Sequence, residues 1–169
     1  MAHPNVVFMG VCGCGKSTVA RRYAAGAGYV VVEADDFHPP ANVAKMRSGQ
    51  PLTDEDRAGW LAALAARISE GRARGETMVL TCSALKRAYR DRLRQADPDL
   101  FFVHLAGTRE LLAQRLGERQ GHFMPASLLD SQLAALEAPQ APSERCLTVD
   151  IAAAPEVLCA TVATFLRSL

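Results

Sequence analysis

Apolar and amphipathic segments alternate along the whole of this chain. Five short runs are almost continuously apolar and rich in β-branched or aromatic residues, and a stretch with helical periodicity follows each of them. The runs cover residues 5–10, 29–34, 77–83, 100–107 and 146–151. Near-continuous apolar character is typical of strands that are buried on both faces. The pattern therefore predicts an α/β fold, in which helices flank a five-stranded parallel sheet.

The spacing of apolar positions predicts the helices between these strands. They fall at residues 16–25, within 39–49, and at 53–71, 84–95, 108–119 and 126–136, with a closing helix from residue 155. Thr53 and Thr108 are expected to cap two of them, and three acidic residues that follow Thr53 suit a helix N-terminus. Because there is no internal repeat, low-complexity tract or linker, residues 1–169 are predicted to form a single domain.

A glycine-rich stretch, GVCGCGKST, stands between the first strand and the first helix. It fits the pattern G-x-x-x-x-G-K-[ST], in which backbone N–H groups of the loop surround a phosphate chain. In that pattern Lys16 bridges the outer phosphates and the Ser17 hydroxyl binds Mg²⁺, so the stretch predicts a site for ATP and Mg²⁺. The expected ATP-binding residues here are Gly10, Gly13, Cys14, Gly15, Lys16, Ser17 and Thr18.

Cys12 and Cys14 raise the alternative of a metal or redox site within this loop. The chain has five cysteines, an odd number, and no C-x-x-C pair, which argues against a disulfide framework. No cluster of Cys or His elsewhere in the sequence supplies further metal ligands. We therefore interpret both residues as small side chains in variable loop positions, and hypothesise that their oxidation blocks nucleotide binding.

Composition narrows the range of partners. The chain is 49% hydrophobic and 22% charged, with a formal net charge of +1. This near-neutral balance argues against broad electrostatic binding to nucleic acid or to an anionic membrane. No apolar run has the length of a membrane span, and the N-terminus shows no export signal. The sequence therefore predicts a cytoplasmic protein with a small-molecule partner, and neither nucleic acid nor membrane as a partner.

Residues on the acceptor side of the site should follow the second and third strands. The second strand runs into EADDFHPP, which places Glu33, Asp35, Asp36 and His38 at the carboxyl edge of the sheet, where ligands bind in this architecture. A carboxylate here can orient an attacking hydroxyl group and accept its proton. The alternative is an acidic, solvated turn before a helix.

The third strand runs into CSALKRAYR and brings cations to the same edge. Lys86 and Arg90 are four residues apart and share a helix face, which suits an anionic substrate such as a sugar acid. Arg115 and Arg119 have the same spacing and precede the sequence GHF, so they predict a segment that closes over the phosphates. Solvated surface arginines are the alternative in both places.

Five segments together resemble the gluconokinases, small P-loop kinases that phosphorylate D-gluconate. They are GVCGCGKST, DDFHPPANVAKMRSGQPLTDEDRAGWL, CSALKRAYRDRLR, RLGERQGHF and VDI, in the order seen in that family and across nearly the whole chain. The resemblance implies a single-domain P-loop kinase with sheet order 2-3-1-4-5 and a lid segment at about residues 115–125. It also implies ATP and Mg²⁺ use, transfer to the 6-hydroxyl of gluconate, and a homodimer.

The resemblance also implies roles for individual residues. Lys16, Asp35 and Arg119 would be catalytic, and Arg115 would bind ATP. The substrate-binding residues would be Asp35, His38, Lys86, Arg90 and His122. The family places an adenine-contacting loop at residues 138–145. Glu33 stands where related small kinases often have Asp, and Cys12 and Cys14 stand where the family often has serines.

Two other functions stay open on the residues alone. One is a kinase for a different small acid, such as shikimate or another aldonate. The other is a nucleotide-dependent switch that acts on a protein partner, although the chain lacks a guanine-reading motif of the N-K-x-D type.

Overall fold

The central sheet is fully parallel and has five strands. The computed structural model describes residues 3–118 and 126–169. Its strands are β1 (Val6–Met9), β2 (Val30–Glu33), β3 (Met78–Thr81), β4 (Phe101–Ala106) and β5 (Cys146–Asp150). Their order in the sheet is β2-β3-β1-β4-β5, with β1 between β3 and β4. The predicted fold class and strand order are both confirmed.

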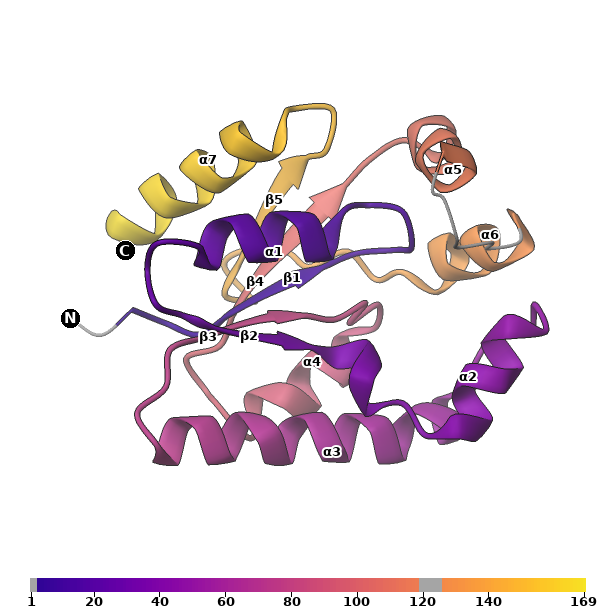
Figure 1. Ribbon diagram of the computed structural model, residues 1–169, viewed down its shortest axis with the longest axis horizontal. Coiled ribbons are helices and arrows are strands. Elements are labelled where there is room, and N and C mark those ends of the chain that lie inside the picture. The colour runs from indigo at the N-terminus through magenta and orange to yellow at the C-terminus, as the bar shows by residue number, and fades with distance from the viewer. Residues whose placement is uncertain (1–2, 119–125) are drawn as a thin grey trace.

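Helices cover both faces of this sheet and gather at its carboxyl edge. They are α1 (Lys16–Ala24), α2 (Pro40–Arg47), α3 (Asp54–Ala73), α4 (Arg87–Arg94), α5 (Arg109–Glu118), α6 (Ala126–Ala135) and α7 (Pro155–Arg167), with a 3₁₀ turn, η1 (Ala34–Phe37), directly after β2. Figure 1 shows α1 and α7 on one face and α3 and α4 on the other. In the same view α2, α5 and α6 lie beyond the ends toward which the strands point.

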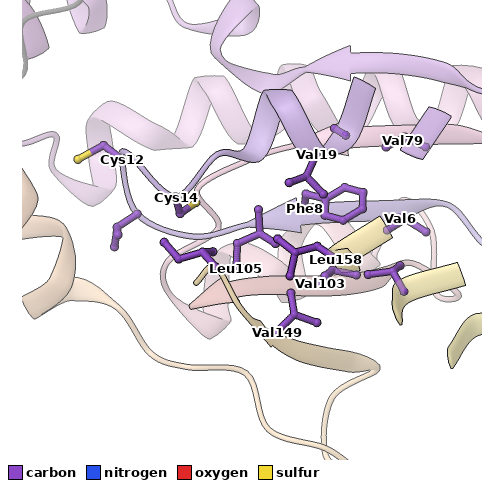
Figure 2. Close-up of a cluster of buried hydrophobic side chains, with 14 of the residues drawn as sticks. Val6, Phe8, Cys12, Cys14, Val19, Val79, Val103, Leu105, Val149 and Leu158 are labelled. Carbon is purple, nitrogen blue, oxygen red and sulfur yellow. The ribbon is translucent and has the colours of Figure 1, made fainter. Parts of the chain in front are cut away.

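The core forms two apolar layers because successive strand residues point to opposite faces. Phe8 and Val103 pack with α1 and α7 in the layer that Figure 2 shows in part. Met9 and Phe102 pack on the other face, against Trp60 of α3. The sheet is thus buried on both sides, as the near-continuous apolar runs predict.

Local signals set most helix boundaries, with one clear exception. Thr53 caps α3 in a reciprocal capping box with Asp56, and Thr108 accepts a hydrogen bond from the backbone N–H of Leu111, so both expected caps are confirmed. The helix predicted at residues 84–95 begins only at Arg87. The backbone of Ala84 has φ 45°, which is incompatible with a helix, and the segment before Arg87 forms an irregular loop instead.

No helix in the described ranges 3–118 and 126–169 combines the length and apolar character needed to cross a membrane.

Candidate active site

The phosphate-binding loop leaves the N-terminus of α1 open. Gly15 caps the helix in a left-handed conformation, with φ 91°, and no side chain caps the first turn. No acidic residue occupies that turn either. The free N–H groups and the helix dipole therefore favour an anion at this end. Gly13 has φ 83°, and a Cβ atom there would lie 2.9 Å from Leu116 Cγ, so the loop needs glycine at this position.

Lys16 and Ser17 are both held at the mouth of this loop. The Lys16 ammonium donates to the backbone carbonyls of Gly10 at 3.0 Å and Val11 at 3.1 Å. The Ser17 hydroxyl donates to Glu33 Oε2 at 2.9 Å, and the Thr81 hydroxyl donates to the same oxygen. A hydroxyl and a carboxylate thus lie side by side at the carboxyl edge of the sheet.

The two loop cysteines lie in different surroundings. Cys14 is 1% exposed, beneath the loop, and its Sγ lies 3.8 Å from Lys16 Nζ. Figure 2 shows the Cys12 side chain pointing away from the other labelled side chains of the cluster. The backbone N–H of Cys12 donates to Gln132 Oε1 of α6 at 2.7 Å. Both thiols are buried, so they fill space in the loop, and their oxidation remains a hypothesis.

A cavity of about 390 Å³ runs from the loop to the acceptor side of the site. Asp35, His38, Arg57 and Ser83 line its acceptor side, beyond the loop residues. A smaller cavity of about 210 Å³ adjoins it, because Met46, Leu52, Arg57 and Gln132 line both. The smaller cavity adds Thr53, Asp54 and Lys86 to the wall. The loop and the predicted acceptor residues thus line two adjoining cavities.

The acceptor carboxylate is accessible and lies beside a fixed imidazole. The Asp35 side chain is 88% exposed, whereas that of His38 is only 5% exposed. The His38 ring stacks on Trp60, with centroids 4.3 Å apart and 16° between the planes. Burial lowers the pKa of His38, and the charge of Arg57 adds to this effect while that of Asp35 opposes it. Asp36 is not among the residues that line either cavity.

Two cations lie at the far end of the acceptor space. Lys86 Nζ lies 3.0 Å from Asp54 Oδ1, and this hydrogen bond raises the pKa of the lysine. The Tyr89 hydroxyl donates to the same carboxylate and, together with Lys86, lowers its pKa. Arg57 donates to the Leu52 carbonyl at 2.7 Å and stands 5.4 Å from the centroid of the Tyr89 ring. Arg57 thus lines both cavities, and Lys86 lines the smaller one.

The structure does not bring Arg90 into this space, which corrects the predicted grip by Lys86 and Arg90 together. Arg90 is 1% exposed and forms a bidentate ion pair with Glu144, at 2.8 and 3.0 Å. Its remaining N–H groups donate to three backbone carbonyls, those of Ala84, Leu85 and Glu137. All five donors are therefore used inside the protein, and none is left for a substrate.

Near Arg115 the large cavity is lined by Ala153 and Pro155, which follow β5. Arg115 lines it and donates to the Ile151 carbonyl at 2.6 Å, beside Ala153 and Pro155. Residues 138–145, the expected adenine-contacting loop, contribute nothing to the wall and pack on α4 through Arg87, Arg90 and Arg94. Arg119 and His122, with most of the predicted lid at 115–125, lie outside the described residues.

Arg57, Trp60 and Gln132 are wall residues that sequence reasoning missed. Arg57 stands in the first turn of α3, just past the capping box, and this turn begins at the carboxyl edge of the sheet. Trp60 is 1% exposed and belongs to the core, but it also borders the large cavity. The capping box followed by a cation was the available signal for Arg57, whereas nothing local marks Gln132.

A parallel sheet in this order, with a phosphate-binding loop after β1 and an acceptor space at the same edge, defines a P-loop kinase of small molecules. A family model described as an AAA domain matches residues 6–139. The gluconokinase of Gluconobacter oxydans is 55% identical over 134 residues, covering 79% of this chain and 75% of that protein. The thermosensitive gluconokinase of Escherichia coli is 41% identical, covering 89% and 81%.

Solved structures agree with these relatives. A sugar kinase from Janibacter has a TM-score of 0.93 at 47% identity, covering 98% of this chain and 95% of that one. A gluconokinase from Sinorhizobium meliloti has a TM-score of 0.89 at 44% identity, covering 98% and 93%. The chain belongs to the gluconokinase family.

Proposed function

We propose that this chain transfers the γ-phosphoryl group of ATP to the 6-hydroxyl group of D-gluconate. The observation that carries the proposal is the pair of adjoining cavities, whose lining includes the phosphate-binding loop, the exposed carboxylate of Asp35 and the cations of Arg57 and Lys86. A polyhydroxy acid fits this wall, because its alcohol end needs a proton acceptor and its carboxylate end needs cations.

The loop residues would hold the phosphates for in-line transfer. The Lys16 ammonium, which contacts two loop carbonyls, would turn onto the β- and γ-phosphates. The paired Ser17 hydroxyl and Glu33 carboxylate are oxygen donors of the kind that Mg²⁺ takes alongside phosphates and waters. When bound, the metal ion would neutralise charge on these phosphates.

Asp35 would orient the acceptor hydroxyl and take its proton, because its carboxylate is exposed to the cavity next to the loop. Lys86 and Arg57 would bind the gluconate carboxylate, and Arg57 replaces Arg90 in this role. Arg115, with Ala153 and Pro155, would border the adenine base. Arg119 would stabilise transition-state charge and His122 would contact the substrate, as the family resemblance implies.

Release of ADP with different acceptors tests the reaction directly. With ATP and Mg²⁺, we expect D-gluconate to stimulate ADP release far more than shikimate, other aldonates, AMP or no acceptor, and ³¹P NMR of the product to show a 6-phosphate monoester. Equal stimulation by another acid would reassign the substrate, and slow release that ignores every acceptor would favour a nucleotide switch.

Asp35→Asn tests the proposed base. We expect kcat to fall by about 10²-fold or more, because the amide cannot accept the proton, while the KM for ATP stays unchanged. Asp36→Asn is the matched control, since Asp36 lines neither cavity. Near-normal turnover of the Asp35 variant would remove this residue from the chemistry.

The family resemblance further supports a cytoplasmic homodimer as part of this proposal. Sedimentation of the purified chain at several concentrations would test the dimer, which predicts about twice the mass of the 18.2 kDa chain.

A further inference from the structure

Asn42 is a buried polar residue that the proposed mechanism does not use. It is 4% exposed and lies on α2, between η1 and the first turn of α3. Its side-chain Nδ2 lies 2.8 Å from the backbone carbonyl oxygen of Asp56 and 3.3 Å from His38 Nδ1. The Asn42 amide thus connects the first turn of α3 to the His38 imidazole, which lines the large cavity.

The carbonyl of Asp56 determines which end of the amide faces His38. A backbone carbonyl can only accept a hydrogen bond, so the group that contacts it must be the amide NH₂ and not the amide oxygen. The position of that carbonyl is itself well determined, because Asp56 and Thr53 close the capping box of α3 and Lys45 binds the Asp56 carboxylate at 2.6 Å. The second N–H of the same NH₂ group then points at His38 Nδ1.

This contact selects one tautomer of His38. Because Nδ1 accepts from Asn42, it carries no proton, and the neutral ring must carry its proton on Nε2. Protonation of Nδ1 would bring two donors face to face, so Asn42 also disfavours the imidazolium ion. Burial lowers the pKa of His38 in the same direction, and the Arg57 charge adds to it, while Asp35 opposes both.

The Nε2 edge of the ring faces the acceptor carboxylate. His38 Nε2 lies 3.9 Å from Asp35 Oδ1, which is too long for a direct hydrogen bond. Stacking on Trp60 restrains the ring, and Trp60 is itself held by a hydrogen bond from its Nε1–H to the Ala34 carbonyl at 2.7 Å. A hydroxyl group between the two can donate to Asp35 and accept from His38 at once.

We propose that Asn42 is a positioning residue that holds His38 in its Nε2–H tautomer, so that His38 donates a hydrogen bond to a hydroxyl oxygen of the acceptor beside Asp35. His38 would then donate to a lone pair of that hydroxyl oxygen, and Asp35 would accept a hydrogen bond from its proton, so that both contacts orient the hydroxyl group. This inference rests on the proposed place of the acceptor at Asp35.

The tautomer can be measured without any activity assay. In a ¹⁵N–¹H long-range correlation spectrum, the tautomers and the imidazolium ion of a histidine give distinct patterns, and the four histidines can be assigned with a His38→Gln variant. We expect the neutral Nε2–H pattern for His38 at pH 7, and a change in its shifts on addition of D-gluconate. A Nδ1–H pattern or an imidazolium ion in the unmodified protein would overturn the proposal.

Asn42→Asp tests the positioning role, because a carboxylate of the same shape can only accept. We expect His38 to take up a proton on Nδ1 and the KM for gluconate to rise about tenfold, the effect of one hydrogen bond to a neutral group, with the KM for ATP unchanged. A variant that loses thermal stability but keeps both the tautomer and the gluconate KM would show that Asn42 is merely structural, and would overturn the proposal.

Two variants of His38 keep the test independent of Asn42. His38→Gln retains an N–H donor, and its gluconate KM should stay within about threefold of that of the unmodified enzyme. His38→Phe retains the ring on Trp60 without the donor, and should raise this KM about tenfold. Equal values for the two variants would refute a donor role. If gluconate is turned over but leaves the His38 signals unmoved, the acceptor lies elsewhere, and the placement at Asp35 fails while the tautomer stands.

Discussion

Replacement of Arg90 tests whether this residue stabilises the fold, as its contacts indicate, or binds the substrate, as the sequence suggested. In Arg90→Met the apolar side chain keeps most of the volume but removes the bidentate bond to Glu144 and the bonds to three carbonyls. Glu144, whose side chain is 3% exposed, would then be left with Arg94 at 3.0 Å as its remaining cation.

The size of the effect follows from this burial. Breaking a buried ion pair by removing one partner costs about 3–5 kcal/mol, because the other charge stays buried with less compensation. For a domain of this size, each kcal/mol shifts Tm by about 2–4 °C, so we expect a fall of roughly 6–20 °C. The gluconate KM of the folded variant, measured at 20 °C, should stay within about twofold of the unmodified enzyme, since Arg90 does not reach the cavity.

A double variant shows whether the pair itself carries the effect. Arg90→Met with Glu144→Leu removes both charges, and should recover at least about half of the lost stability in urea unfolding. An unchanged unfolding midpoint in Arg90→Met, together with a gluconate KM raised tenfold, would refute the structural role and return Arg90 to the substrate.

The stability lost in Arg90→Met should depend on pH, and the pKa of Glu144 determines the direction. Burial alone would raise the pKa of Glu144, but the hydrogen bonds and charges of Arg90 and Arg94 outweigh it and hold the pKa below its ordinary value of 4.5. The stability that this carboxylate contributes is therefore present above about pH 4.5 and is lost as the pH falls through the lower folded-state pKa. The stability difference between the unmodified protein and Arg90→Met should accordingly shrink below that pH.

Three further substitutions test the site and its support. Arg57→Ala should raise the gluconate KM by about tenfold or more with the KM for ATP unchanged, and an effect on ATP alone would contradict its placement. Gly13→Ala should raise the KM for ATP at least about tenfold, because the new Cβ would meet Leu116 at 2.9 Å and φ is 83°; Gly59→Ala, where a Cβ meets nothing within 4 Å, is the control and should leave it unchanged. Trp60→Phe should cost about 1–3 kcal/mol in urea unfolding, because it leaves the buried Ala34 carbonyl without its donor, and an unchanged midpoint would contradict that contact.

Local chemistry accounts for what could be predicted from the sequence alone. Strand positions follow from continuous apolar runs, since a strand that is buried on both faces carries apolar residues on both. The loop is recognisable because a phosphate chain needs N–H groups at a helix N-terminus and glycines that leave room for it. The cap at Thr53 is equally local, since its partner Asp56 lies three residues away.

Contacts between distant segments decided the rest. Lys86 and Arg90 look equivalent at helical spacing, yet the irregular loop at Ala84 starts the helix late and turns Arg90 toward Glu144, 54 residues further along the chain. Arg57 reaches the cavity only because α3 begins at the carboxyl edge of the sheet. The orientation of Asn42 likewise depends on a carbonyl of another helix.

The sequence by itself thus determined the fold and the phosphate end of the site, because these rest on neighbours in the chain. Tertiary structure alone decided which polar side chains face the acceptor, because burial and hydrogen bonding of each depend on segments far away in the sequence.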